Sequence, residues 1–402
     1  MKNLIKKFIP EPFLNFYHFI LAFLGEMIYR FPSKQLKVIG VTGTSGKSTV
    51  VEMTAKILEE AGYKVASLSS IKFKIGEKEW QNKLKMTMPG RWEIQKFLRQ
   101  AVDKDCQYAI LEVTSEGIKQ YRHKFIDFDA AVLTNLSPEH IEVHGGFEKY
   151  KEAKAKLFKA TKKIHIINLD DKNAEYFWKI PAETKIGYSI NEGVKLLPKN
   201  FKLLGRFNLH NAVAATKVGL SQGISLEVCQ RALEKVKGIP GRMEIIIKEP
   251  FTVIVDYAHT PEELKNVYET IENWKLKIGN SRMICVLGAC GGGRDKWKRP
   301  VMGKIASQYC SEVIITNEDP YDEGPMEIIE QIAAGAGDRA RKILDRREAI
   351  RQALRLARPG DMVVITGKGC EPWLCLAKGK KIPWDDRQVA REEFQRNFYP
   401  TP

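Results

Sequence analysis

The chain has 402 residues, of which 44% are hydrophobic and 28% are charged, a composition typical of a globular protein of two or three domains with their own cores. Its net charge of +16 is high, but the lysines are spread along the chain without a helix-turn-helix, RNA-recognition or zinc-finger pattern, so no specific nucleic-acid binding is expected. An anionic substrate and an anionic membrane surface are equally consistent with this charge.

The seven cysteines show neither a C-x-x-C pair nor the spacing of a zinc ribbon. This usage is typical of reduced thiols, and it predicts a cytoplasmic protein. No cleavable signal peptide is expected, because the apolar stretch near the start is not followed by a small-residue cleavage site.

Residues 1–36 form an apolar segment that differs from the rest of the chain. Aromatic and aliphatic side chains are dense in it, with Lys6 and Lys7 before them and Arg30 after them. The stretch is short and polar for a membrane-spanning helix, which needs about 20 mostly apolar residues. We expect a helix packed on the domain that follows. The alternative is an interfacial helix that lies on the inner face of a membrane or contacts a lipid-linked substrate.

From residue 37 the pattern changes to alternating strands and helices. A helix is expected over 50–61, and apolar runs typical of buried strands occupy 37–41, 63–68, 108–113, 130–133 and 164–168. Such alternation predicts a mostly parallel sheet that is covered by helices.

A glycine- and proline-rich linker at 238–241 precedes a second α/β series. Its expected helices are 262–274 and 346–357, and its expected strands are 252–256, 283–287, 312–316 and 362–366. We therefore predict three parts: an appendage over 1–36, a central domain over 37–237, and a Rossmann-like α/β domain over 238–402.

A glycine-rich loop lies between the first strand and the first helix of the central domain. Its residues are Gly43, Thr44, Ser45, Gly46, Lys47, Ser48 and Thr49. In such loops backbone N–H groups surround phosphate oxygens, the lysine neutralises the terminal phosphates, and the hydroxyl after it can bind Mg²⁺. The strict motif would need glycine at Val41, so this is a variant. It predicts an ATP-binding domain of the P-loop ATPase type.

This variant loop and the motifs that follow it resemble the Mur ligase family. The motifs occur in the family's order over residues 36–402: 111–117 (LEVTSEG), 134–140 (TNLSPEH), 144–145, 150–154 (YKEAK), 205–208 with Asn211, 241–244 (GRME), 256–261 (DYAHTP), 288–296 (GACGGGRDK) and 367–371 (GKGCE). The resemblance implies an ATP-dependent ligase that joins a carboxylate to an amine through an acyl phosphate. Its substrates would be an amino acid and a peptide-bearing cell-wall precursor.

The resemblance also implies catalytic and metal-binding residues. Lys47 and Ser48 would act with Glu112, which ends a strand at the same edge of the sheet, in a Mg²⁺ site. His140 would help to hold a second Mg²⁺, together with Lys154 in a carbamylated form. The alternatives are a solvated carboxylate at Glu112, a structural histidine at His140, and a solvated helix face for Lys154.

Nucleotide contacts are implied for three further residues: Asn211 at the adenine, Arg242 at the phosphates and Asp256 at the ribose. His259 belongs to the same motif as Asp256, and Lys296 and Arg299 lie in a basic segment expected near the nucleotide. A buried ion pair is the alternative for each.

Candidate substrate-binding residues fall into two groups. Thr87, Thr114, Ser115 and Arg122 are expected to hold the acceptor peptide. The second group lies in the C-terminal motifs and comprises Glu318, Asp319, Gly367 and Glu371.

Three departures from the family pattern affect the expected substrates. The uridine-nucleotide-binding domain that the family has at its N-terminus is expected to be replaced by residues 1–36, which favours a lipid-linked or shorter acceptor as an alternative. The Asp-Asn-Pro-Arg motif of diaminopimelate-adding enzymes reads Glu-Asp-Pro-Tyr, with Tyr321 in place of the arginine that holds a distal carboxylate. Glu116 replaces a histidine.

Two other classes of protein are alternatives to a murein-type ligase. A folylpolyglutamate-like or cyanophycin-like ligase would share the phosphate loop, but the motifs at 256–261 and 367–371 favour the murein group. A decayed ATP-binding scaffold would have lost one of Lys47, Glu112, His140 or Lys154, and all of these are present.

Overall fold

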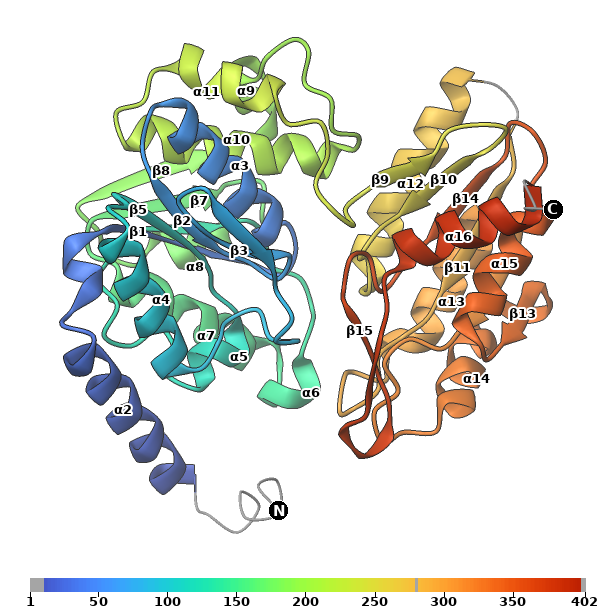
Figure 1. Ribbon diagram of the computed structural model, residues 1–402, viewed down its shortest axis with the longest axis horizontal. Helices are drawn as coiled ribbons and strands as arrows, with labels where there is room; N and C mark the ends of the chain where they lie inside the picture. Colours follow the sequence, from blue (N-terminus) through green and yellow to red (C-terminus); the bar gives the residue numbers. More distant parts are fainter. Residues whose placement is uncertain (1–10, 279–280, 399–402) are drawn as a thin grey trace. The chain divides into compact units, whose positions relative to one another are not determined.

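The computed structural model of the chain describes residues 11–278 and 281–398. The chain divides into two compact units, both drawn in Figure 1. Unit 1 comprises Met1–Pro138, Phe147–Lys202 and Phe207–Val236, and unit 2 comprises Glu139–Gly146, Leu203–Arg206 and Lys237–Pro402. Among the described residues, no helix combines the length and the apolar character that crossing a bilayer requires.

Unit 1 is built on an eight-stranded sheet with the strand order β4-β3-β2-β5-β1-β6-β7-β8. The strands are β1 (Lys37–Thr42), β2 (Val65–Leu68), β3 (Lys72–Ile75), β4 (Lys78–Gln81), β5 (Tyr108–Glu112), β6 (Phe128–Leu133), β7 (Ile164–Asn168) and β8 (Thr184–Tyr188). All pairings are parallel except those of β3 and β4, which form an antiparallel hairpin at one edge. The central strand β1 is buried beyond its first residue, as strands covered on both faces are.

Helices cover both faces of this sheet (Figure 1). They are α3 (Lys47–Glu60), α4 (Arg91–Asp103), α5 (Ser115–Lys119), α7 (Phe147–Ala160), α8 (Ala174–Trp178), α9 (Ile190–Gly193), α10 (Arg206–Ser221) and α11 (Leu226–Glu234). Helix α3 packs on β1, β2 and β5 beside α11, whereas α7 packs on β1 and β6. The buried core lies between these helices and the strands, as the alternation of strand and helix requires.

The apolar segment near the N-terminus contains helix α2 (Glu11–Ile28), followed by a 3₁₀ turn at Pro32–Gln35. Helix α2 packs against α4, which agrees with the first interpretation of this segment. The part of the appendage before Glu11 lies outside the described residues.

Unit 2 is built on a six-stranded sheet with the strand order β13-β12-β11-β14-β10-β9. Its strands are β9 (Glu244–Ile247), β10 (Thr252–Val255), β11 (Met283–Leu287), β12 (Glu312–Thr316), β13 (Ala340–Ile343) and β14 (Met362–Ile365), and β15 (Trp373–Cys375) and β16 (Lys381–Pro383) form a separate hairpin. Only β9 runs antiparallel within the larger sheet.

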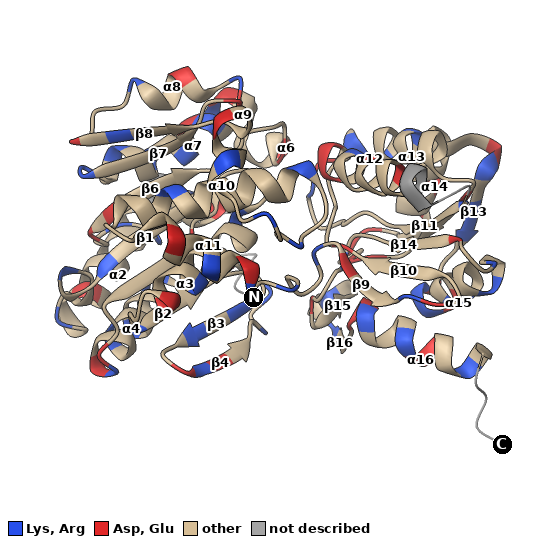
Figure 2. Ribbon diagram, turned by 90° about the horizontal axis from the view of Figure 1, so that it is seen from above, with Lys and Arg blue, Asp and Glu red and all other residues tan. Residues whose placement is uncertain are grey.

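The helices of unit 2 lie in two layers (Figure 2). Helices α12 (Pro261–Ile278), α13 (Lys298–Tyr309) and α14 (Pro325–Ala336) cover one face, and α15 (Arg346–Leu356) and α16 (Asp386–Phe398) cover the other. The short helix α6 (Ile141–His144) belongs to this unit by its contacts. The predicted fold class, two α/β units with mostly parallel sheets and an apolar N-terminal helix, is confirmed.

Some predicted element boundaries were wrong by a few residues. The helix expected from residue 50 begins at Lys47, because Gly46 takes the left-handed conformation (φ 78°) that ends the loop and caps the helix. The strand expected from residue 63 begins at Val65, after a turn through Gly62 (φ 87°). The β3–β4 hairpin was not predicted. Domain limits at 36/37 and 237/238 stay predictions.

Candidate active site

The phosphate loop connects the end of β1 to the start of α3 at the carboxyl edge of the unit 1 sheet. Gly43 (φ 150°) and Gly46 (φ 78°) have positive φ values that other residues rarely adopt. Lys47, Ser48 and Thr49 form the first turn of α3, where backbone N–H groups point away from the helix. The loop therefore provides the positive electrostatic environment that phosphate groups prefer.

Residues after β6 support the backbone of this loop. The N–H of Thr44 donates to the Asn135 carbonyl (2.9 Å), and the N–H of Ser45 donates to Oδ1 of Asn135 (3.0 Å). The Thr134 hydroxyl donates to the Ser45 carbonyl (2.7 Å). A Cβ added at Gly43 would collide with the Thr134 hydroxyl, so glycine is required there for steric reasons as well.

Glu112 and Ser48 meet beside the phosphate loop. The Ser48 hydroxyl donates to Oε2 of Glu112 (2.8 Å), which also accepts from the backbone N–H of Ser70 (2.8 Å), and Oγ of Ser48 and Ser70 are 2.8 Å apart. Glu112 is 3% exposed and Ser48 is 4% exposed. The alternative of a solvated strand-end carboxylate was therefore wrong for Glu112. These hydroxyl and carboxylate oxygens are the hard ligands that Mg²⁺ prefers.

Lys154 lies beneath the loop rather than on a solvated helix face. It is 2% exposed, its Nζ donates to the Gly43 carbonyl (2.7 Å), and Nζ lies 4.7 Å from the centre of the Tyr150 ring. The Tyr150 hydroxyl is 3.1 Å from the Thr44 hydroxyl. Lys47 donates to the Thr44 carbonyl (2.7 Å), so both lysines contact the loop.

Asn211, on α10, also contacts the phosphate loop. Its side chain is buried, and its Nδ2 donates to Oδ1 of Asn208 (3.4 Å). Its Oδ1 lies next to Gly46, in the space that a Cβ at that position would occupy. The contact at the adenine that the family resemblance implies stays a prediction.

The candidate acceptor residues lie together in unit 1. Thr114 caps the short helix α5, which contains Ser115, and its Oγ1 accepts from the Gly117 N–H (3.1 Å). Arg122 donates to the carbonyl of Met88, which follows Thr87, and to Oε1 of Gln120 (2.7 Å). Burial lowers the pKa of the Arg122 guanidinium. The contacts of Arg122, whose backbone N–H donates to the Gly117 carbonyl of α5 (2.9 Å), hold the turn at residues 86–89 near that helix.

In unit 2, Asp256 follows β10 and lies near Arg242. Its carboxylate accepts from the backbone N–H groups of Met243 (2.7 Å) and Ala258 (2.6 Å). Burial raises the pKa of Asp256 to about 6, against the opposing effect of the Arg242 charge. The Arg242 guanidinium stacks on the Tyr257 ring, with its central carbon 4.3 Å from the ring centre.

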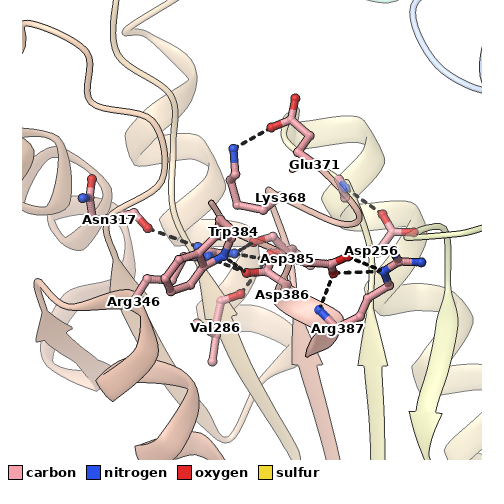
Figure 3. Close-up of polar contacts among 12 residues, drawn as sticks. Asp256, Val286, Asn317, Arg346, Lys368, Glu371, Trp384, Asp385, Asp386 and Arg387 are labelled. Carbon is pink, nitrogen blue, oxygen red and sulfur yellow. Dashed lines mark hydrogen bonds and ion pairs between the residues drawn. The ribbon is translucent and has the colours of Figure 1, made fainter. Parts of the chain in front are cut away.

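A buried lysine, Lys368, joins the two C-terminal substrate motifs. It donates to both carboxylate oxygens of Asp319 (2.9 Å each). It also donates to Oε2 of Glu371 (2.6 Å), a contact drawn in Figure 3. The Tyr257 hydroxyl donates to Oε1 of Glu371 (3.3 Å). Lys368 was not among the predicted site residues. The glycines on either side of it, Gly367 and Gly369, were a usable signal, because glycine allows a side chain to lie close to the backbone.

Glu318 is the most unusual carboxylate of this group. It is 4% exposed, and its Oε2 has no hydrogen-bond partner among the described residues. The same oxygen lies next to Gly367, in the space that a Cβ at that position would occupy. Burial raises the pKa of Glu318, and the Arg346 charge opposes this shift. Nearby, burial lowers the pKa of His259, whereas the charge and hydrogen bond of the Glu263 carboxylate, 3.1 Å away, raise it, and the net shift of the pKa is upward.

His140 precedes helix α6 in unit 2, whereas Lys154 lies in unit 1. Nη1 of Arg294 is 3.0 Å from Nδ1 of His140. The Asp295 carboxylate accepts from the first backbone N–H groups of α6, those of Ile141 (3.2 Å) and Glu142 (3.0 Å). These contacts fix the position of His140 within unit 2.

Two further arginines of unit 2 form buried ion pairs. Arg299 is fully buried and pairs with Glu323 (2.9 Å), so the ion-pair alternative applies to it; Lys296 also approaches Glu323 (3.6 Å). Arg346 makes two hydrogen bonds with Asp386 (2.8 and 2.7 Å) and donates to the Thr366 carbonyl (2.7 Å), as Figure 3 shows in part.

Comparison with known proteins identifies the family of this chain. The profile of the Mur ligase middle domain matches residues 41–201, and that of the Mur ligase glutamate ligase domain matches residues 241–369. A UDP-N-acetylmuramoyl-L-alanyl-D-glutamate–2,6-diaminopimelate ligase from Syntrophomonas wolfei is 39% identical over 92% of this chain and 81% of its own length. The chain belongs to the Mur ligase family. Members of this family are ATP-dependent, and this chain is an ATP-dependent ligase that forms amide bonds.

Two other proteins are similar to this chain. A UDP-N-acetylmuramyl-tripeptide synthetase from a Roseiflexus species is 35% identical over 94% of this chain and 82% of its own length. The solved folylpolyglutamate synthase of Mycobacterium tuberculosis, in complex with ADP and AMPPCP, has a TM-score of 0.69 and covers 94% of this chain and 95% of its own, but at 16% identity it shows the fold alone.

Several residues that shape the site of this Mur ligase were missed in the sequence. Ser70, Asn135 and Tyr150 contact the phosphate loop or its Mg²⁺-binding candidates. Asn135 and Tyr150 lie inside the motifs at 134–140 and 150–154, so their motif membership was a usable signal. Ser70 lies just after β2 and belongs to none of these motifs. It could have been identified only from the knowledge that β2 and β5 are neighbours in the sheet.

Proposed function

We propose that this Mur ligase adds the third residue to the peptide of a peptidoglycan precursor. The observation that carries the proposal is the buried Ser48–Glu112 contact beside the phosphate loop. It brings a hydroxyl and a carboxylate to the place where ATP and its metal would bind. The relatives named for the diaminopimelate-adding and tripeptide-forming reactions support the choice of reaction.

Ser48 and Glu112 would hold the Mg²⁺ that accompanies ATP. Among the described residues there is no cluster of three or more histidine, cysteine or acidic side chains, so most ligands would be phosphate oxygens and water, as is usual for Mg²⁺. The metal, when bound, reduces the negative charge of the phosphates. The donor set fits this ion, because both protein ligands are oxygen atoms.

The residues of the chain then bind and orient the reactants. The phosphate loop and Lys47 hold the γ-phosphoryl group for in-line transfer to the acceptor carboxylate. One carboxylate oxygen forms a bond to phosphorus while the bond from the γ-phosphorus to the bridging oxygen breaks, which gives an acyl phosphate and ADP. The amine of the incoming amino acid attacks the acyl carbon, phosphate leaves, and the amine loses a proton. Asn211, Arg242 and Asp256 would hold the nucleotide.

We further propose that Lys154 is carbamylated in the active enzyme. A carbamate on its Nζ would keep one N–H to donate to the Gly43 carbonyl and would add an anionic group under the phosphate loop. With His140 it would bind a second Mg²⁺. The support for this role is the burial of Lys154 and its contact with the loop.

Thr87, Thr114, Ser115 and Arg122 would hold the acceptor, whose dipeptide ends in the reacting carboxylate. The UDP-linked form is the first candidate because of the names of the relatives. A lipid-linked or shorter acceptor is the alternative, and a folylpolyglutamate-like substrate is a more distant one. We place the reaction in the cytoplasm, where ATP is available.

The incoming amino acid would bind beside Glu318, Asp319, Gly367 and Glu371. The arginine that would hold a distal carboxylate is absent, and Tyr321 takes its position with its ring against Gly292. The buried Glu318 carboxylate, with Oε2 lacking a hydrogen-bond partner among the described residues, suits a cationic amine. These features favour a lysine-like amino acid over diaminopimelate.

The test is phosphate release from ATP and Mg²⁺ with UDP-N-acetylmuramoyl-dipeptide and a panel of amino acids, with product masses determined. The proposal requires release that depends on both substrates and a product with the mass of a new amide. Tyr321→Arg should raise kcat/KM for diaminopimelate at least about tenfold relative to that for lysine, since it adds a bidentate partner for the distal carboxylate. Failure of every amino acid, while ATP still binds, would exclude the UDP-linked acceptor.

A further inference from the structure

Helix α2 carries an apolar stripe on its exposed side. The residues of this stripe are spaced three, four or seven apart, so they project from one face of the helix. Their exposed fractions are 69% for Phe13, 65% for Phe16, 55% for Tyr17, 41% for Leu24, 47% for Met27 and 55% for Ile28. Large apolar side chains that are exposed next to one another mark an interaction surface.

The opposite face of α2 is packed on unit 1 and fixes the direction of the stripe. His18, Ala22 and Glu26 are buried on that face, and Gly25 faces α4 near Trp92. Phe19 and Phe23, at the side of the helix, pack against the ring of Phe125, with ring centres 5.0 and 5.5 Å apart. The helix lies at the edge of unit 1 beside α4 (Figure 1).

Basic residues flank α2 in the sequence. In the sequence, Lys6 and Lys7 precede α2, and Arg30 and Lys34 follow it and are exposed. The Lys34 ammonium lies 5.0 Å from the centre of the Phe31 ring, which extends the apolar surface. The stripe itself has no charged residue. A second copy of this chain would bring the same basic charges to the contact, so self-association is disfavoured by electrostatic repulsion.

We propose that α2 docks on an anionic phospholipid membrane, with its axis in the plane of the surface. The stripe would enter the boundary between headgroups and acyl chains, and the basic residues at its ends would contact the anionic headgroups. The packed face stays on α4, so the helix lies on the membrane and does not cross it. Helix α4 begins at Arg91, directly after the turn that contains Thr87, so docking would hold the candidate acceptor residues near the membrane.

Vesicle co-sedimentation of the full chain tests this proposal without any use of its activity. The chain should sediment with vesicles of phosphatidylglycerol and phosphatidylcholine, and much less with phosphatidylcholine alone. Added salt should weaken the binding, because it screens the headgroup contacts. The double variant F16E/L24E should lower the partition coefficient by at least about tenfold, since it removes two apolar groups from the stripe.

Two further variants distinguish the loss of apolar side chains from the stripe from the addition of negative charge to the protein. F16S/L24S keeps the net charge and should also lose most of the binding, whereas L344E adds a negative charge at a 46% exposed leucine of unit 2 and should keep most of it. Thermal unfolding confirms that each variant is folded. Wild-type protein that stays in the supernatant with anionic vesicles would overturn the proposal. A concentration-dependent dimer would also overturn it, if F16S/L24S dissociates that dimer and anionic vesicles fail to dissociate it. In that case a second copy of the chain would cover the stripe.

Discussion

The hydroxyl of Ser48 donates a 2.8 Å hydrogen bond to the carboxylate of Glu112, in a position where both side chains are shielded from solvent. The two residues are 64 positions apart in the chain, and they meet because β1 and β5 are adjacent and parallel, with Val41 paired to Glu112. The contact therefore links the phosphate loop directly to the end of the neighbouring strand.

Substitution of Glu112 by glutamine should abolish most ligase activity. The amide keeps the size of the side chain but removes the negative charge that would hold Mg²⁺, so kcat should fall by about 10²-fold or more. Steady-state phosphate release measures this. Glu60→Gln is the matched control, because Glu60 pairs with Lys235 (2.6 Å) on the surface and lies outside the site. Near-wild-type turnover of Glu112→Gln would remove Glu112 from the proposed metal site.

Gly43→Ala should weaken ATP binding at least about tenfold, because Gly43 has a positive φ and its new Cβ would collide with the Thr134 hydroxyl. Calorimetric titration with a non-hydrolysable ATP analogue measures the change. Gly62→Ala is the control for backbone strain, since Gly62 also has a positive φ (87°) but no atom lies within 4 Å of an added Cβ. It should lower Tm and leave the affinity for the analogue unchanged. Equal affinities for all three proteins would contradict the assigned role of the loop.

Asp256 should make the protein less stable as the pH rises from about 4 to 6. Its folded-state pKa is raised to about 6 from an ordinary value of 3.8, so the folded protein binds the proton more tightly than the unfolded chain. Folding stability from this group is therefore greatest below pH 3.8 and decreases through that window, by at most about 3 kcal/mol.

Urea unfolding of the wild type and of Asp256→Asn at several pH values isolates this effect. The difference in unfolding free energy should shift in favour of the variant as the pH rises from 4 to 6, since asparagine does not titrate. A difference that is constant with pH would show that the pKa of Asp256 is not raised.

Arg346→Met should destabilise unit 2 strongly, because it leaves the fully buried Asp386 carboxylate without its charged partner. The expected loss of unfolding free energy is about 3–5 kcal/mol. Thermal unfolding measures it, and Arg341→Met is the control, since the half-exposed Arg341–Glu312 pair (3.0 Å) should contribute less than about 1 kcal/mol. Arg346→Lys should also lose stability, because lysine cannot make the paired contacts with Asp386. Equal losses for Arg346→Met and Arg341→Met would contradict this account.

Much of unit 1 could be predicted because its signals are local. The apolar runs that became β1 and β5 are long and continuous, and the glycines of the phosphate loop mark the turn between β1 and α3. The family resemblance implied that Glu112 and Ser48 act together, and their proximity agrees with the rule that parallel strands end at the same edge of a sheet. The hairpin of β3 and β4 was missed because each strand has only four residues, too few for a clear alternation.

The placement of His140 could not be predicted, because it depends on contacts between residues far apart in the chain. The carboxylate that caps α6 comes from Asp295, about 150 positions later, and the partner of Glu139 is Lys298, at 3.0 Å. The burial of Lys154 was equally hidden. Five lysines from Lys149 to Lys159 look alike in composition, and only the family resemblance singled out Lys154. Its contact with the phosphate loop depends on the packing of α7 on β1.

The transfer of labelled oxygen from the acceptor tests the central claim most directly. Acceptor dipeptide with oxygen-18 in its reacting carboxylate is incubated with ATP, Mg²⁺ and the amino acid that gives turnover, and the released phosphate is analysed by mass spectrometry. An acyl phosphate formed at the loop of Lys47 and Ser48 predicts one labelled oxygen in the phosphate and the other in the new amide. Unlabelled phosphate, or label in AMP, would contradict activation by the γ-phosphoryl group of ATP.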